Sequence, residues 1–205
     1  MKRKKKKQPL KIYKGSTESL VFKPLLFIDF EYITTSYRDN GHRQHLQEIL
    51  SVLAKTAYWL SNKGFILRSG GAEGCDKAFE YGCDKANGQK EIYLPWKGFN
   101  GSKSEYVVSD KKAFEIAAQY HPRYATLKDA AKRLQARNSH QVLGWNLETP
   151  SDFIICYTKN GKGEGGTGQA LRIAKHYNIP IFDFGKYEDI SKARKEFMDF
   201  IKPFI

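Results

Sequence analysis

The chain has 205 residues and a formal net charge of +13, with 40% hydrophobic and 14% aromatic residues. This length and composition fit one globular domain with its own hydrophobic core and exclude an intrinsically disordered chain. No apolar run approaches the roughly 20 residues that cross a bilayer, and the basic start is not followed by the apolar core of a signal peptide. We therefore expect a cytoplasmic protein with no membrane contact.

Six of the positive charges stand in one run near the N-terminus, which leaves about +7 on the rest of the chain. Because like charges repel, the run predicts a disordered basic arm within residues 1–20, ahead of one domain at 21–205. The arm would bind nucleic acid by neutralising phosphates, and a solubilising tail is the alternative. Its residues are Lys2, Arg3, Lys4, Lys5, Lys6 and Lys7.

Short apolar runs typical of buried strands alternate with segments whose apolar residues recur at helical spacing. In chain order we expect strand 25–28, helix 46–60, strand 65–68, helix 75–86, strand 91–94, helices 110–120 and 127–142, strand 153–157, helix 170–177, strand 179–184 and helix 188–200. This alternation predicts an α/β fold, a Rossmann-like parallel sheet with helices on both faces.

The strand at 65–68 leads into a glycine-rich turn that opens a helix. Glycines let the backbone approach a ligand closely, and a helix N-terminus presents unpaired N–H groups and a partial positive charge. The turn is a candidate phosphate site, and a tight turn that binds nothing is the alternative. The candidate ligand-binding residues are Arg68, Ser69, Gly70, Gly71, Ala72, Gly74 and Asp76.

A second glycine-rich loop opens the helix after the strand at 153–157. In a parallel sheet both loops lie at the carboxyl edge, where α/β proteins bind ligands. Two anion sites on one edge suit a nucleotide or a nucleic-acid backbone, although neither loop fits GxGxxG or the Walker pattern. The second set of candidates is Gly165, Gly166, Thr167 and Gly168, joined by Arg137 and Asn138 from the helix at 127–142.

Several of these side chains also have a structural alternative. Arg68 either contacts phosphate or pairs with Glu73. Asp76 either caps its helix or hydrogen-bonds a base or ribose. Arg137 and Asn138 either contact the ligand or bond a neighbouring loop.

Three cysteines without CxxC spacing favour reduced thiols over disulfides or a zinc site. No His, Cys and Asp cluster suggests a metal. The aromatic residues Trp96, Phe99 and Tyr106 either stack on the bases of a single strand or pack in the core or between subunits.

Six motifs, in order, carry a resemblance to a known family. They are SGGAEGCDKAF at 69–79, EIYLPW at 91–96, HP at 121–122, ARNSHQVLG at 136–144, PSDF at 150–153 and GGTGQA at 165–170. Over residues 21 to about 185 the chain resembles the Rossmann-type domain of DNA-processing protein A (DprA/Smf), above all the short forms that bacteriophages encode. That domain belongs to a wider group with the LOG phosphoribohydrolases and the nucleotide-sensing SLOG domains.

The resemblance implies a parallel sheet and a homodimer or higher homo-oligomer. It also implies single-stranded DNA or a nucleotide as ligand, a recombinase as partner, no cofactor, and the host cytoplasm if the chain is phage-encoded. We therefore expect a DNA-binding protein in a recombination-mediator role. Sequestering or sensing of a free, for example cyclic, nucleotide is the alternative.

The chain departs from the family in two places. Phage members carry a Gly-x-Gly-Ser-Arg turn after the first strand, where this chain has Asp29 and Glu31, and these carboxylates would repel a phosphate. LOG enzymes carry a catalytic Glu shortly after their GGxGT loop, whereas Gly168, Gln169 and Ala170 directly follow Thr167 here, which argues against that hydrolysis. The enzymatic alternative is attack by Asp29 or Glu31 on a sugar, as in nucleoside deoxyribosyltransferases. Otherwise both carboxylates are solvated or pair with Arg38 or Arg43.

Overall fold

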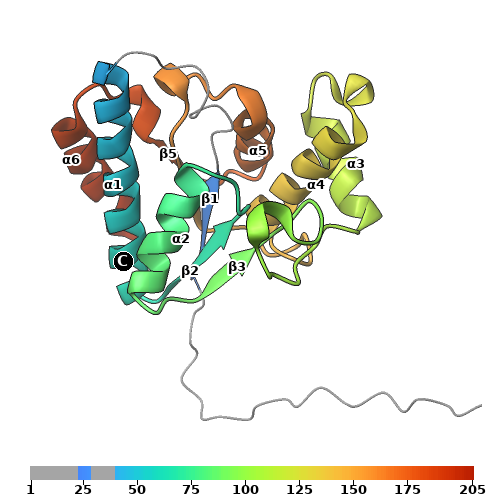
Figure 1. The fold of residues 1–205 in the computed structure, drawn as a ribbon, viewed down its shortest axis with the longest axis horizontal. Coiled ribbons are helices and arrows are strands. Elements are labelled where there is room, and N and C mark those ends of the chain that lie inside the picture. The colour runs from blue at the N-terminus through green and yellow to red at the C-terminus, as the bar shows by residue number, and fades with distance from the viewer. Residues whose placement is uncertain (1–22, 29–39) are drawn as a thin grey trace, which may run out of the picture.

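The computed structural model describes the backbone of residues 23–28 and 40–205, and the side chains from residue 45 onward. This part of the chain forms a mixed α/β structure (Figure 1). Its strands are β1 (Lys23–Ile28), β2 (Phe65–Ser69), β3 (Lys90–Ile92), β4 (Phe153–Cys156) and β5 (Ile181–Asp183). Its α-helices are α1 (Asn40–Asn62), α2 (Cys75–Lys85), α3 (Lys111–Tyr120), α4 (Asp129–Leu143), α5 (Gly165–His176) and α6 (Ile190–Ile201).

The strands pair in parallel in the order β3-β2-β1-β4-β5. Leu25 of β1 lies opposite Leu67 of β2 on one side and Phe153 of β4 on the other. The strand order therefore changes direction between β1 and β4. In open α/β sheets such a switch point places the loops after the two strands around a crevice at the carboxyl edge.

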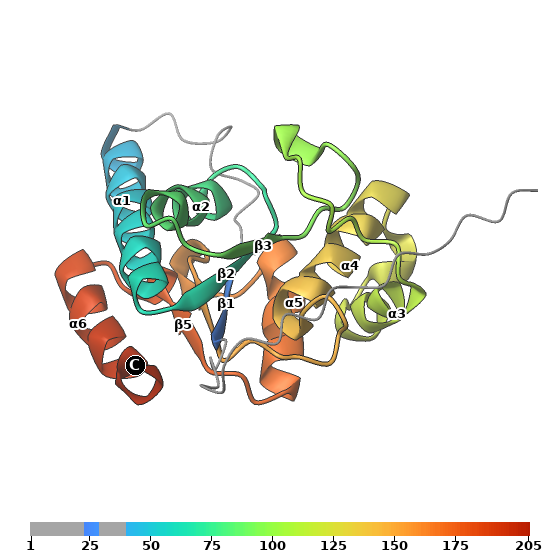
Figure 2. The same cartoon turned by 90° about the horizontal axis from the view of Figure 1, so that it is seen from below.

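Helices cover both faces of the sheet, with α1, α2 and α6 on one side and α3, α4 and α5 on the other (Figures 1 and 2). Side chains along β4 alternate between the two faces of the sheet, and both faces are apolar, which explains why helices cover both. Phe153 and Ile155 are buried in the core beneath α1, α2 and α6, whereas Ile154 and Cys156 are buried in the core beneath α4 and α5. A strand buried on both faces needs a continuous apolar run, which is what the sequence has here.

Close helix packing and hydrogen-bonded caps fix the helices around the sheet. A Cβ on Gly82 of α2 would lie 2.0 Å from the carbonyl oxygen of Ala54, so α1 and α2 approach closely because this position is glycine. Asp110 accepts a hydrogen bond from the backbone of Lys112 at the start of α3, and Asp189 caps α6 in the same way.

The expected alternation of strands and helices is confirmed within the described residues, and so is the α/β class. Three strands end earlier than expected. β4 ends at Cys156, β5 spans only Ile181–Asp183, and β3 ends at Ile92, because Leu94 turns away to form an isolated parallel bridge with Val107. The predicted basic arm and the carboxylates Asp29 and Glu31 lie outside the described residues. Within the described residues, the helices are too short or too polar to cross a membrane.

Candidate functional site

The first glycine turn, between β2 and α2, is closed by a carboxylate of the chain itself. Asp76, in the first turn of α2, accepts hydrogen bonds through Oδ2 from the backbone N–H of Gly70 (3.1 Å) and of Ala72 (3.0 Å). The N–H of Gly71 donates to the Ser69 hydroxyl oxygen (3.3 Å). The turn from Ser69 to Ala72 is buried. A phosphate cannot use the Gly70 and Ala72 N–H groups while Asp76 holds them.

This geometry bears on two expectations about the first turn. Among the described contacts, the hydrogen bonds of Asp76 go to the turn ahead of α2, so its main role is not to cap its own helix. The anion that the turn binds in this structure is an internal carboxylate. Gly74, with φ of 93°, precedes α2 and is half-buried.

Arg137 of α4 clamps the same turn from the other side. Its Nη1 donates to the carbonyl oxygen of Gly70 at 2.6 Å and lies 3.8 Å from Oδ2 of Asp76, and both side chains are buried. A Cβ on Gly70 would lie 1.8 Å from that Nη1. A larger residue at position 70 would therefore displace the Arg137 guanidinium from the turn.

In the buried pair of Asp76 and Arg137, the guanidinium only partly offsets the cost of burying the carboxylate. Burial raises the pKa of Asp76 from 3.8 to about 7, and the Arg137 guanidinium and the N–H groups of the turn counter that rise only in part. The neighbouring carboxylate of Glu80 adds to the increase. Asp76 thus titrates close to neutral pH.

The second glycine loop is more open than the first. Gly165 begins α5 with φ of 72°, is exposed, and has open space where a Cβ would stand, while Gly166 is half-buried. Thr167 and Gly168 are buried in the first turn of the helix. Asn138 of α4 donates from Nδ2 to the carbonyl oxygen of Gly166 at 3.1 Å. The accessible N-terminus of α5 is therefore at Gly165 and Gly166.

A small network at the end of β4 holds this loop in place. The backbone N–H of Thr158 donates to Asp183 (2.9 Å), the Thr158 hydroxyl donates to the same carboxylate, and the N–H of Gly163 donates to the Thr158 hydroxyl oxygen (3.0 Å). A Cβ on Gly168 would lie 2.6 Å from the carbonyl oxygen of Gly163. The loop folds back tightly on the first turn of α5, which requires glycine at position 168.

The adjacent residues Arg137 and Asn138 hold the two glycine loops together. One bonds the carbonyl of Gly70 and the other the carbonyl of Gly166. This is the structural alternative for both side chains. In addition, Nε of Arg137 and Oδ1 of Asn138 are buried without a hydrogen-bond partner among the described residues.

Arg68 also has a structural role, but its partner is not the one expected. Its Nε donates to Glu91 at 2.8 Å, and its Nη1 donates to the carbonyl oxygen of Thr149 (2.8 Å) and to the hydroxyl of Ser151 (3.2 Å). The acidic partner is thus Glu91 on the neighbouring strand and not Glu73. These bonds tie the end of β2 to the segment that leads into β4.

Three exposed aromatic side chains, which belong to two ring pairs, lie in the segments that follow β3 and α4. Trp96, Tyr106 and Trp145, which we call the aromatic surface, are 39%, 36% and 41% exposed. The Tyr106 and Trp145 rings pack edge to face with centroids 5.3 Å apart, and Trp96 packs against Phe99 at 5.1 Å. Buried Tyr93 stacks on Trp145 at 6.1 Å with an interplanar angle of 7°, which fixes the orientation of the Trp145 ring.

The sequence indicated Trp96, Phe99 and Tyr106 but not Trp145. Trp145 follows Gly144, whose φ of 79° ends α4 and turns the chain toward the other rings. The only signal in the sequence is a tryptophan directly after a helix-ending glycine. Its meeting with Tyr106, 39 positions earlier in the chain, depends on the fold.

Comparisons with protein-family models, with curated proteins and with solved structures find no match for this chain. Within the described part of the chain, no group of three or more His, Cys, Asp or Glu residues is placed to hold a metal ion. All three cysteines are buried free thiols, and burial raises the pKa of Cys156 well above its usual value.

Proposed function

We propose that this chain is a Rossmann-like protein of the DprA type that binds single-stranded DNA, in a recombination-mediator role. The observation that carries the proposal is the aromatic surface. Two of its members are tryptophans, and each is more than one-third exposed although burial would be favourable. Aromatic side chains on which bases stack are the usual platform for single strands, and stacking is worth about 1–3 kcal/mol per base.

The charge of the molecule supports the same ligand. Exposed Lys97 directly follows Trp96, and the chain carries +13 overall. A positive surface beside stacking rings combines phosphate neutralisation with base contacts, which gives affinity without strong sequence preference. The homo-oligomer and the recombinase partner implied by the family resemblance belong to the same proposal.

The proposal is tested by measuring the binding of a short fluorescent oligothymidine through its fluorescence anisotropy. Trp96→Ala and Trp145→Ala should each weaken binding about fivefold or more, because each removes one stacking platform. Tyr58→Ala is the matched control, since Tyr58 is 48% exposed on α1, away from the aromatic surface. Thermal unfolding of each variant separates loss of binding from loss of fold. Wild-type affinity in both tryptophan variants, or a loss in Tyr58→Ala as large as theirs, would contradict the proposal.

A second candidate function is binding of a free nucleotide at the N-terminus of α5. The observation that favours it is the accessible backbone at Gly165 beside Oδ1 of buried Asn138, which has no hydrogen-bond partner in the described part of the chain. Helix N-termini attract phosphate, and an amide oxygen can accept a hydrogen bond from a ligand. A nucleotide bound there would depend on Asn138 and not on the aromatic surface.

A further inference from the structure

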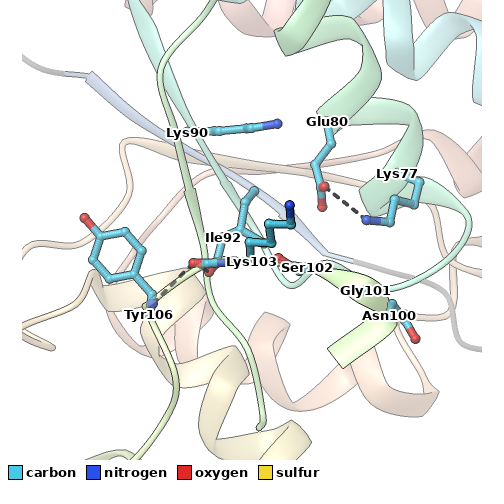
Figure 3. Close-up of a pocket in the computed structure, with 10 residues that line it drawn as sticks. Lys77, Glu80, Lys90, Ile92, Asn100, Gly101, Ser102, Lys103 and Tyr106 are labelled. Atoms are coloured by element: carbon cyan, nitrogen blue, oxygen red, sulfur yellow. Dashed lines mark hydrogen bonds and ion pairs between the residues drawn. The ribbon is translucent and has the colours of Figure 1, made fainter. Parts of the chain in front are cut away.

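A concave site lies at the edge of the sheet, beside the first glycine turn and away from the second glycine loop. It is a cavity of about 390 Å³ between α2, β3 and the segment 100–106 (Figure 3). Three lysines line it, one from each of these parts of the chain: Lys77, Lys90 and Lys103. Glu80 is the acidic residue among the lining side chains, and in Figure 3 the three lysines extend toward the side of the cavity where it lies.

The single carboxylate does not balance the lysines. Glu80 is buried, and its two oxygens accept hydrogen bonds from the Ser69 hydroxyl (2.9 Å) and from Nζ of Lys77 (3.3 Å). Lys90 pairs with Asp84 at 2.5 Å, an exposed ion pair that contributes little and is easily exchanged. Lys103 has no ion pair among the described residues. Lys90 and Lys103 therefore remain available for an anionic ligand.

The wall that carries Lys103 is already held in place. Nδ2 of Asn100 donates to the carbonyl oxygen of Gly71 (3.1 Å), and the Ser104 hydroxyl donates to the carbonyl oxygen of Ile92 (2.6 Å). The N–H of Ser104 donates in turn to the Ser102 hydroxyl oxygen (3.3 Å). These bonds fix the segment against the edge strand β3, so a ligand need not order it. Such preorganisation lowers the free-energy cost of binding.

We propose that this cavity binds a terminal phosphate monoester. A monoester carries about −1.5 to −2 charges at pH 7, which matches an excess of two lysines over the carboxylate. A phosphodiester inside a strand carries one charge, and the chain on both sides of it keeps it out of a recess. Only the end of a strand, or a small molecule, can place its phosphate among the three ammonium groups.

The ligand chemistry has two sources, the phosphorylated end of a DNA strand and a free nucleoside monophosphate. Binding of a strand end rests on the proposed function, and one contact in the structure supports this source. Tyr106 lines the cavity and also packs against Trp145 of the aromatic surface. A strand stacked on the aromatic surface would therefore have the cavity beside its path.

The experiment compares matched oligothymidines with a hydroxyl end, a 5′-phosphate or a 3′-phosphate, together with thymidine monophosphate and inorganic phosphate. A phosphate at one end should tighten binding about fivefold or more, and Lys103→Ala and Lys77→Met should each remove that gain. Both variants should leave binding of the hydroxyl-ended strand within twofold of the wild type. Lys192→Ala on α6, the matched control for loss of one exposed lysine, should keep the gain.

The outcomes separate this inference from the proposed function. If no strand binds but thymidine monophosphate binds and requires Lys103, the cavity is a small-molecule site and the strand proposal fails. If the hydroxyl-ended strand binds and no phosphate adds affinity, whether on a strand end or free, the inference is overturned while the proposed function stands. Monophosphate binding that survives both lysine variants but is lost in Asn138→Ala also overturns it and assigns the ligand to the N-terminus of α5.

Discussion

Asp76 is the residue that decides how the first glycine turn is used. Its Oδ2 holds two N–H groups of the turn, while Oδ1 has no hydrogen-bond partner among the described residues. The carboxylate is fully buried, and Arg137 is the cation that the described residues place beside it. Burial thus opposes its charge more strongly than its partners favour it, and the pKa rises to about 7.

This raised pKa makes the stability of the protein depend on pH. Between pH 3.8, the ordinary pKa of the group, and about 7, the folded state binds a proton that the unfolded state has lost. The contribution of Asp76 to stability is therefore full below pH 3.8 and falls as pH rises toward 7, by up to about 1.4 kcal/mol per pH unit.

Asp76→Asn should remove this dependence, because an amide does not titrate and its oxygen can still accept from Gly70 and Ala72. We expect the free energy of unfolding of the wild type, relative to the variant, to fall between pH 5 and pH 7 in denaturant titrations and to level off at higher pH. Glu73→Gln, in the same turn but exposed, is the control and should follow the wild type. Parallel profiles for wild type and Asp76→Asn would show that Asp76 does not titrate in this range.

At the scale of elements, α4 is the part that joins the two glycine loops. Arg137 and Asn138 stand next to each other near the middle of the helix and bond one loop each. The pair lies in one of the motifs that carry the family resemblance. From the sequence alone, contact with a ligand and a bond to a neighbouring loop were both open for these side chains. The structure shows that both loops are held, so the spacing between them depends on α4.

Gly70→Ala tests this clamp. The added Cβ would lie 1.8 Å from Nη1 of Arg137, so the guanidinium must leave the turn and Asp76 loses its cation. Breaking a buried charge pair costs about 3–5 kcal/mol, and we expect a loss of about that size in denaturant unfolding. In an Arg137→Ala background the same substitution should cost much less, since the clash is gone. Additive effects of the two substitutions would show that Gly70 is needed for another reason.

The elements themselves were largely predictable, because β1, β2 and β4 contain short apolar runs and the helices have apolar residues at helical spacing. Contacts between side chains far apart in the sequence were not predictable in this way. Arg68 has Glu73 five positions away, yet it pairs with Glu91, since β2 and β3 are neighbours and place the two side chains together. The same holds for Lys77, Lys90 and Lys103, which the sequence spreads over two elements and a loop. No local sequence pattern predicts a cavity whose walls come together only after folding.

For the whole molecule, the order of strands decides which loops meet. Because β1 lies between β2 and β4, the two glycine loops follow strands on either side of β1 at the carboxyl edge. The aromatic surface and the lysine-lined cavity instead lie beside edge strand β3. A single strand bound there would leave the α5 N-terminus available, so the two candidate functions use different parts of one molecule.

The net charge of +13 makes a prediction for the molecule as a whole, because six of these charges stand at residues 2–7. If the basic run contacts DNA, removing it should weaken binding of single strands and lower its salt dependence. Each phosphate contact to a single strand contributes about 0.7 to the slope of log K against log salt concentration. Replacing residues 2–7 by six Gly and Ser residues should therefore reduce the slope by up to about 4, as measured by anisotropy titrations over a series of salt concentrations. Trp145→Ala, which removes a stacking contact and no charge, should lower affinity at every salt concentration and leave the slope unchanged. A slope that does not change in the Gly and Ser variant would mean that the lysines of the folded domain make all the phosphate contacts.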